Sequence, residues 1–274
     1  MYRFGWFSTG TSEAACQMLT AAMDSIEQGE IDGRIEFIFC NRERGDSKNS
    51  DRFLDLAESY HIPLIRYSYP KYQIARGLQN PDLEEPLPEW RLDYDREVMK
   101  RLKDYEADIS VLAGFMMVTG PELCQKYDMI NLHPALPGGP VGDWKQVIWE
   151  LIGSQARETG VLMNLVTPEM DKGPVVTYCK FSIQGEPFDS LWQEIEGRSI
   201  EQIQQEEGRS NELFKLIRQH GLAREFPLII ATMKAFSNGK IRITDEKQVV
   251  DAENRPIKGY NLTEEIDEKV KGLL

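Results

Sequence analysis

The sequence predicts an α/β fold with a doubly wound, mostly parallel sheet and an antiparallel edge. Short apolar runs alternate with amphipathic segments through the first 150 or so residues, the pattern of repeated βαβ units. The last two runs, 161–166 and 174–183, are separated by a loop too short for a parallel crossover, so they should pair antiparallel. No apolar run reaches the roughly 20 residues that a membrane helix needs, so we expect no membrane association.

The expected strands are short apolar runs, and the expected helices lie between most of them. The strands are 3–7, 34–40, 63–66, 109–113, 129–132, 161–166 and 174–183. The helices are 12–27, 50–60, 93–105, 121–126 and 143–151.

We expect one α/β domain over residues 1–245 and a charged C-terminal extension over 246–274. Two stretches exceed a minimal domain and are interpreted as insertions. Residues 67–91, rich in Pro, Tyr and acidic residues, should form a long loop of the kind that acts as a lid or binding loop. Residues 189–219 should form a polar helical stretch broken at Gly197 and Gly208. In the extension we expect a turn near 256–259, followed by a short helix.

Composition limits the classes of function. The net charge of −13 disfavours a wide nucleic-acid surface, because neutralising phosphates requires clustered Lys and Arg. An anionic small substrate remains compatible where a few cations and backbone amides gather. The four cysteines lack CxxC spacing, which indicates buried thiols and no metal site. The chain begins directly in a strand without the regions of a signal peptide, so we expect a cytoplasmic protein.

The residues with the clearest chemical potential follow the fifth expected strand. Asn131 and His133 lie two residues apart, so they point to one face of that strand, and Pro134 ends it. Open α/β sheets bind ligands at such carboxyl strand ends. Asp171 lies in the loop after the run 161–166. An amide, an imidazole and a carboxylate suit proton transfer and oxyanion stabilisation. The spacing alone equally allows a strand-end histidine that caps backbone groups and an unrelated surface aspartate.

Three segments carry a family resemblance: Asp108–Met116, Ile130–Pro134 and Met170–Pro174. In order and spacing they resemble the folate-dependent formyltransferases, over residues 1–183 and more loosely 212–245. Within that family they are most similar to the enzymes that formylate glycinamide ribonucleotide. The resemblance implies formyl transfer from 10-formyltetrahydrofolate to a primary amine, without a metal.

The resemblance also implies roles for individual residues. The catalytic residues would be Asn131, His133 and Asp171: the amide would donate to the developing oxyanion, while the imidazole and the carboxylate would move the amine's proton. The residues that bind the folate co-substrate would be Gly114, Phe115, Met116, Met117, Val118, Glu169, Met170 and Lys172. The residues that bind a phosphorylated amine would be Thr9, Gly10, Thr11, Ser12, Pro134 and Asn164.

Two of these segments also have plainer interpretations. The turn 9–12 precedes a helix, so it is either a phosphate site or simply a tight turn that carries the helix cap. The segment 114–118 is either the wall of a pterin pocket or a turn at the edge of the core. The sequence leaves both alternatives open, and both interpretations of the first turn are compatible with each other.

Two positions depart from the family pattern. Asn164 stands where these enzymes usually carry a second histidine, so a proton relay through that position is lost. An ungapped match of 219–227 puts Leu222 where the family has an acidic contact near the ribose phosphate. Glycinamide ribonucleotide is therefore the first candidate acceptor, with an amino sugar nucleotide or another amine as the alternative. A formyltetrahydrofolate hydrolase, or a non-catalytic protein that binds folate or a phosphometabolite, also remains open.

Overall fold

The computed structural model describes residues 1–78, 87–169 and 172–273, and it confirms the predicted fold class. An eight-stranded sheet has the order β10-β7-β6-β5-β4-β1-β2-β3, and a separate hairpin pairs β8 with β9. The strands of the large sheet are β1 (Tyr2–Ser8), β2 (Gly33–Cys40), β3 (Leu64–Arg66), β4 (Ile109–Leu112), β5 (Met129–His133), β6 (Glu158–Leu165), β7 (Val175–Ser182) and β10 (Tyr260–Asn261). The hairpin consists of β8 (Ile241–Ile243) and β9 (Val249–Asp251).

The expected antiparallel pairing of the last two runs is confirmed, because β6 and β7 pair antiparallel. The strand β6 is also antiparallel to β5, so it runs against both of its neighbours. All other pairs of the large sheet are parallel. The carboxyl ends of β1, β4 and β5, which are adjacent, therefore lie at one edge.

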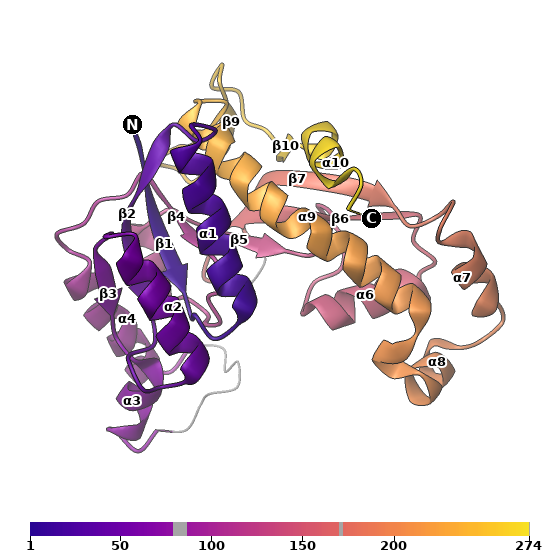
Figure 1. Cartoon of the computed structure of the whole chain (residues 1–274), viewed down its shortest axis with the longest axis horizontal. Coiled ribbons are helices and arrows are strands. Elements are labelled where there is room, and N and C mark those ends of the chain that lie inside the picture. Colours follow the sequence, from indigo (N-terminus) through magenta and orange to yellow (C-terminus); the bar gives the residue numbers. More distant parts are fainter. Residues whose placement is uncertain (79–86, 170–171, 274) are drawn as a thin grey trace.

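Helices fill the connections and cover both faces of the sheet (Figure 1). They are α1 (Glu13–Glu27), α2 (Lys48–Ser59), α3 (Tyr69–Ile74), α4 (Glu89–Arg101), α5 (Pro121–Lys126), α6 (Trp144–Gly153), α7 (Asp189–Glu194), α8 (Ile200–Glu206), α9 (Glu212–Ser237) and α10 (Thr263–Val270). Side-chain caps explain two of the starts: Ser12 accepts from the N–H of Ala15, and Asp143 forms a capping box with Gln146.

The two faces of the sheet bury different side chains. Mostly aliphatic residues of α1, α9 and α10 pack on one face, around Trp6, Val111 and Met163. Aromatic residues of α3 and α4 pack on the other face, around Phe7 and Leu112. Because neighbouring residues in register share a face, Asn131 and His133 lie on the second face with Leu112. This face carries the candidate site.

The prediction of an uninterrupted loop over residues 67–91 is wrong at both of its ends. Ser68 accepts a hydrogen bond from the N–H of Lys71 and starts α3, with Pro70 in the first turn. The helix α4 begins at Glu89, four residues earlier than expected. The overlooked signal was the Ser-Tyr-Pro sequence, which is a favourable helix start. Residues 79–86 of this stretch lie outside the described residues.

The stretch 189–219 is helical and interrupted around Gly197 and Gly208, as predicted. Its last residues, however, form the beginning of α9, which continues for 26 residues and contains Pro227. A proline inside a helix removes one backbone hydrogen bond. Nearly every residue from Leu228 to Phe236 is buried, and this burial offsets the loss.

The C-terminal residues join the same fold. The strand β10 adds to the edge of the large sheet beside β7. The helix α10 buries Ile266 and Val270 in the main core, against α9 and β7. No helix in the described part of the chain is long and apolar enough to cross a membrane.

Candidate active site at the carboxyl ends of β1, β4 and β5

The loops that follow β1 and β4 are tied together by hydrogen bonds. The N–H of Thr9 donates to the carbonyl of Gly114 over 3.1 Å, and the N–H of Met116 donates to the Thr9 hydroxyl over 2.8 Å. Thr9 is 1% exposed. The Thr9 hydroxyl therefore serves to join the two loops, so the sequence-predicted phosphate and pterin segments form one connected wall.

The turn 9–12 has an internal half and an exposed half. Gly10 is buried with φ +66°, and a Cβ there would lie 2.7 Å from the Phe53 ring, so only glycine fits. Thr11 and Ser12 are exposed, and Ser12 caps α1, which confirms the helix-cap interpretation of this turn. Because the first amides of a helix have no intrahelical partner, the exposed half retains donors for an anion. Glu13, the first residue of α1, reduces the local positive charge, although Arg52 pairs with it over 3.1 Å.

The segment 114–118 turns outward from the core. Gly114 has φ +66°, which starts the turn, and Phe115 packs edge-on against Phe7 with ring centroids 5.8 Å apart. Met117 is half-buried, whereas Met116 is 77% exposed. Of the apolar side chains in this segment, Met116 is the one most exposed to a ligand.

A buried ion pair on α4 holds the end of the same loop. Arg91 and Asp95 are each 3% exposed, and their side chains are 2.5 Å apart. The other guanidinium nitrogen of Arg91 donates to the carbonyl of Val118, and the second oxygen of Asp95 accepts from the N–H of Gly120 over 2.7 Å. Both charges therefore act on the backbone of the predicted pterin loop. This pair was not predicted from the sequence, although its i, i+4 spacing on a helix is a local signal.

Asn131 and His133 lie on β5 as predicted, at the edge formed by the carboxyl ends of β1, β4 and β5. Asn131 is half-buried, and His133 is 5% exposed. The Nε2 atom of His133 lies 3.0 Å from the carbonyl oxygen of Pro140. Because a carbonyl can only accept, Nε2 carries the proton in this contact. The loop 134–140 therefore fixes the orientation of the ring, while Pro134 itself is half-buried beside it.

Asn164 lies directly opposite Asn131 in the antiparallel register of β5 and β6. It is 3% exposed, and its Oδ1 atom has no hydrogen-bond partner among the described residues. A buried oxygen without a partner costs about 1–3 kcal/mol. Such an atom is suited to accept a hydrogen bond from a ligand.

A second asparagine, which the sequence analysis did not consider, has the same property. Asn41 directly follows β2, is fully buried, and its Oδ1 atom lacks a partner in the described part of the chain. Its Nδ2 atom contacts the sulfur of Met117 in the segment after β4. The position at a carboxyl strand end was the available signal, but the charged residues next to Asn41 obscured it.

The β6–β7 hairpin carries the remaining predicted residues. Glu169 and Lys172 are both exposed and form an ion pair of 3.2 Å. Met170 and Asp171 lie outside the described residues. The strand β6 runs antiparallel to β5, so the hairpin loop begins beside the first residue of β5. There the N–H of Val166 donates to the carbonyl of Met129. The catalytic role of Asp171 and its proximity to His133 remain predictions.

The described residues contain no group of three or more His, Cys, Asp or Glu side chains that could hold a metal ion. All four cysteines are free thiols, and three of them are buried. Burial raises the pKa of Cys40 and of Cys179 to about 12, which keeps both thiols protonated and unreactive at neutral pH.

The sheet order and the polar residues at its carboxyl edge define an α/β protein of the formyltransferase-like class. The family model described as "Formyl transferase" matches residues 12–193, which is well over half of the chain. The chain therefore belongs to the formyl transferase family.

Several known proteins are similar to this chain. It is 22% identical over 245 residues to the phosphoribosylglycinamide formyltransferase of Escherichia coli, covering 88% of this chain and 92% of that protein. The corresponding enzyme of Coxiella burnetii has a similar solved structure, with a TM-score of 0.63, 20% identity and coverage of 95% and 98%. A formyltetrahydrofolate deformylase from Pseudomonas syringae also shares the fold, with a TM-score of 0.56 and 19% identity, covering 91% of this chain and 65% of that one.

Proposed function

We propose that this protein transfers the formyl group of 10-formyltetrahydrofolate to a primary amine, with glycinamide ribonucleotide as the first acceptor to test. One observation carries the proposal. In a member of the formyl transferase family, Asn131 and His133 share one face of β5, and the unpartnered Oδ1 of Asn164 lies opposite Asn131. One face of these two paired strands thus offers a donor, a titratable ring and a buried acceptor, which supports the proposal.

The folate would bind along the segment 114–118. A pterin ring is flat and carries both N–H donors and acceptors, so it suits a site that combines apolar side chains with unpaired polar atoms. The unpartnered oxygen of Asn41 provides an acceptor, and Phe115 and Met116 provide apolar surface. The Arg91–Asp95 pair keeps the backbone of this segment in place.

Asn131 and His133 would act on the formyl carbonyl. The oxygen of this carbonyl gains negative charge when the amine attacks, and an amide N–H of Asn131 would stabilise that charge by about 3–4 kcal/mol, as in other oxyanion sites. The imidazole of His133 would act as a cation or as a general acid, the role that histidine takes most often in enzymes. Its ring is already oriented by the carbonyl of Pro140.

Proton transfer would involve Asp171 and Asn164. The attacking amine loses a proton as its bond to the formyl carbon forms. A carboxylate at Asp171 would accept this proton and pass it, directly or through water, to the folate nitrogen as the bond between that nitrogen and the formyl carbon breaks. Asn164 does not titrate, so it would hold an N–H of the substrate through its free oxygen. Asp171 would therefore move the proton, and Asn164 would orient the substrate.

The phosphate of the acceptor would lie at the exposed half of the turn after β1. Thr11, Ser12 and the first amides of α1 would donate to it, because a helix N-terminus favours an anion. Leu222 supplies no acidic group for a ribose. The acceptor is therefore the part of the proposal that most needs a direct assay.

The test is a comparison of acceptors with the purified protein and 10-formyltetrahydrofolate. Formyl transfer to glycinamide ribonucleotide, lost in a His133→Asn variant, is the expected result. Transfer to an amino sugar nucleotide or free amine without any ribonucleotide product would overturn the purine acceptor while leaving the formyl chemistry. Release of formate at the same rate without an acceptor would identify a hydrolase, and no turnover together with tight folate binding would identify a binding protein.

A further inference from the structure

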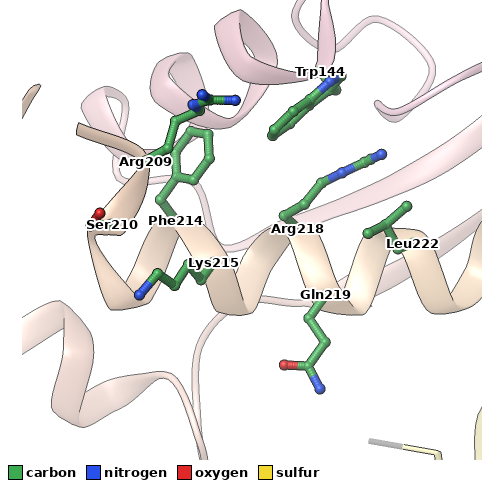
Figure 2. A pocket seen from close by; sticks show the side chains of 8 residues that line it. All are labelled: Trp144, Arg209, Ser210, Phe214, Lys215, Arg218, Gln219 and Leu222. Atoms are coloured by element: carbon green, nitrogen blue, oxygen red, sulfur yellow. The ribbon is translucent and has the colours of Figure 1, made fainter. Parts of the chain in front are cut away.

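A cavity of about 580 Å³ lies between the start of α6 and the first half of α9 (Figure 2). Of its lining residues only Leu222 was considered above, at the position of the family's ribose contact, and no residue assigned to catalysis or folate lines the cavity. Its wall includes Trp144, Arg209, Lys215, Arg218 and Leu222. The volume is in the usual range for sites that bind small molecules.

The charges around this cavity contrast with the acidic chain, whose net charge is −13. Three cationic side chains line it, and two of them have carboxylate partners: Lys215 pairs with Glu212 over 2.7 Å, and Arg218 pairs with Glu225 over 2.6 Å. Arg209 is exposed and forms no ion pair with any other residue that the structure describes. The cavity therefore presents an excess of positive charge, which attracts an anion.

The cavity also presents ordered apolar surface. The guanidinium carbon of Arg218 lies 4.6 Å from the centre of the Trp144 ring, and this cation–π contact holds both side chains in place. Leu222 follows Arg218 by one helical turn and is 46% exposed, so it adds apolar surface beside the ring. In Figure 2, the side chains of Arg209 and Arg218 extend toward the side on which Trp144 lies.

Buried residues and a helix cap support the side chains that line the cavity. Phe214 is 2% exposed and contacts the Trp144 ring at a centroid distance of 5.8 Å. Phe214, Arg218 and Leu222 recur at intervals of four residues, so they lie along one face of α9. The start of α6 is fixed by the Asp143 capping box. The core thus positions Trp144 and the face of α9 that carries Arg218 and Leu222.

We propose that this cavity binds a small molecule in which an anionic group, a phosphate or a carboxylate, is attached to a ring. The anionic group would lie between Arg209 and Arg218, because a guanidinium binds such groups with two parallel hydrogen bonds. The ring would pack on Trp144 and Leu222. The inference does not depend on the formyl-transfer reaction proposed above.

Two probes test this site: phenyl phosphate and adenosine 5′-monophosphate, each of which joins a phosphate to a ring. Titration followed by calorimetry and by tryptophan fluorescence should show saturable binding of both, tighter than that of inorganic phosphate or adenosine alone. Arg209→Gln and Arg218→Gln should each weaken binding about tenfold or more, as expected for the loss of a charged hydrogen bond. Arg157→Gln, at an exposed arginine outside the cavity, is the matched control and should change nothing.

A further variant separates the two halves of the site. Leu222→Asn should weaken both ring-bearing probes and leave inorganic phosphate unaffected. The proposal is overturned if neither ring-bearing probe binds saturably at millimolar concentration. It is also overturned if they bind no tighter than their separate halves, or if the two arginine variants bind them like the unmodified protein.

The natural occupant is then distinguished in the transfer assay. If Arg209→Gln raises the KM of the amine acceptor, the cavity holds part of that acceptor. If the KM is unchanged while the probes no longer bind, the occupant is a separate effector. Both results require probe binding and therefore support the site. If no transfer is detected with any acceptor, the probe titrations still test the site on their own.

Discussion

Asn131 on β5 lies directly opposite Asn164 on β6, and the Oδ1 atom of Asn164 is buried without a hydrogen-bond partner among the described residues. A protein normally pairs or hydrates such an atom. Its position beside the proposed oxyanion donor suggests that the unpaired oxygen is kept for a substrate.

Asn164→Leu should leave the free energy of unfolding unchanged or raise it by up to about 3 kcal/mol, because it removes a buried oxygen that lacks a partner. Formyl transfer should nevertheless fall, since the substrate N–H loses its acceptor. Urea unfolding and kcat/KM measured on the same samples test this. Asn164→His, which restores a polar group, should retain more activity than Asn164→Leu. Full activity in the leucine variant would exclude the proposed role.

His133→Asn and Asp171→Asn should each lower kcat by about a hundredfold or more, the scale of a lost acid–base contribution. The double variant should be far less than additive, because residues that act as a unit lose their function together. His61→Asn is the matched control, because His61 is exposed and asparagine tolerates its positive φ of 56°. Near-normal turnover in either single variant would contradict the roles assigned to these residues.

Arg91→Met should destabilise the fold by about 3–5 kcal/mol, because it leaves the buried carboxylate of Asp95 without its partner. In Arg91→Met protein that remains folded at low temperature, the Kd for a folate analogue should rise, since the carbonyl of Val118 loses its donor. Arg96→Met on the same helix is the control: Arg96 belongs to a partly exposed network, so its loss should cost about 1 kcal/mol or less. Equal effects of the two variants would show that the buried pair has no special role.

His220 makes stability sensitive to mildly acidic pH. Burial, assisted by the charge of Arg224, lowers the pKa of His220 below its ordinary value, and the Phe188 and Phe181 rings contact it at 4.8 and 5.9 Å. The folded protein therefore resists protonation at this residue. Its contribution to stability is complete above the unfolded pKa of about 6.5, and it is lost as the pH falls from there through the lower folded pKa.

The measurement compares urea unfolding between pH 7.5 and 5 for the unmodified protein and for His220→Gln. Carboxylates contribute to both curves, so the difference between the two isolates the histidine. The unmodified protein should lose more stability over this range than the variant. Parallel curves would mean that His220 has the same pKa in the folded and unfolded states.

Local sequence signals were enough to predict much of the fold and part of the site. Alternating apolar runs predicted the strands from β1 to β7, because strand periodicity and turn residues are properties of neighbouring positions. The seven residues between 166 and 174 were too few for a crossover, which determined the antiparallel pairing of β6 and β7. Pro134 ended β5 directly after His133, so the sequence also predicted which strand end would carry the histidine.

The tertiary structure alone decided which distant residues meet. The pairing of β5 with β6 places Asn131 opposite Asn164 across 33 positions of sequence, and no local pattern specifies that register. No local pattern specifies the contact of Trp144 with Arg218 or the hydrogen bond from Arg91 to the carbonyl of Val118 either. Residue type and spacing determine what a segment becomes, because those preferences arise within a few residues. Packing between segments depends on the whole core, so the unpaired oxygen and the cationic cavity emerge only when the chain is folded.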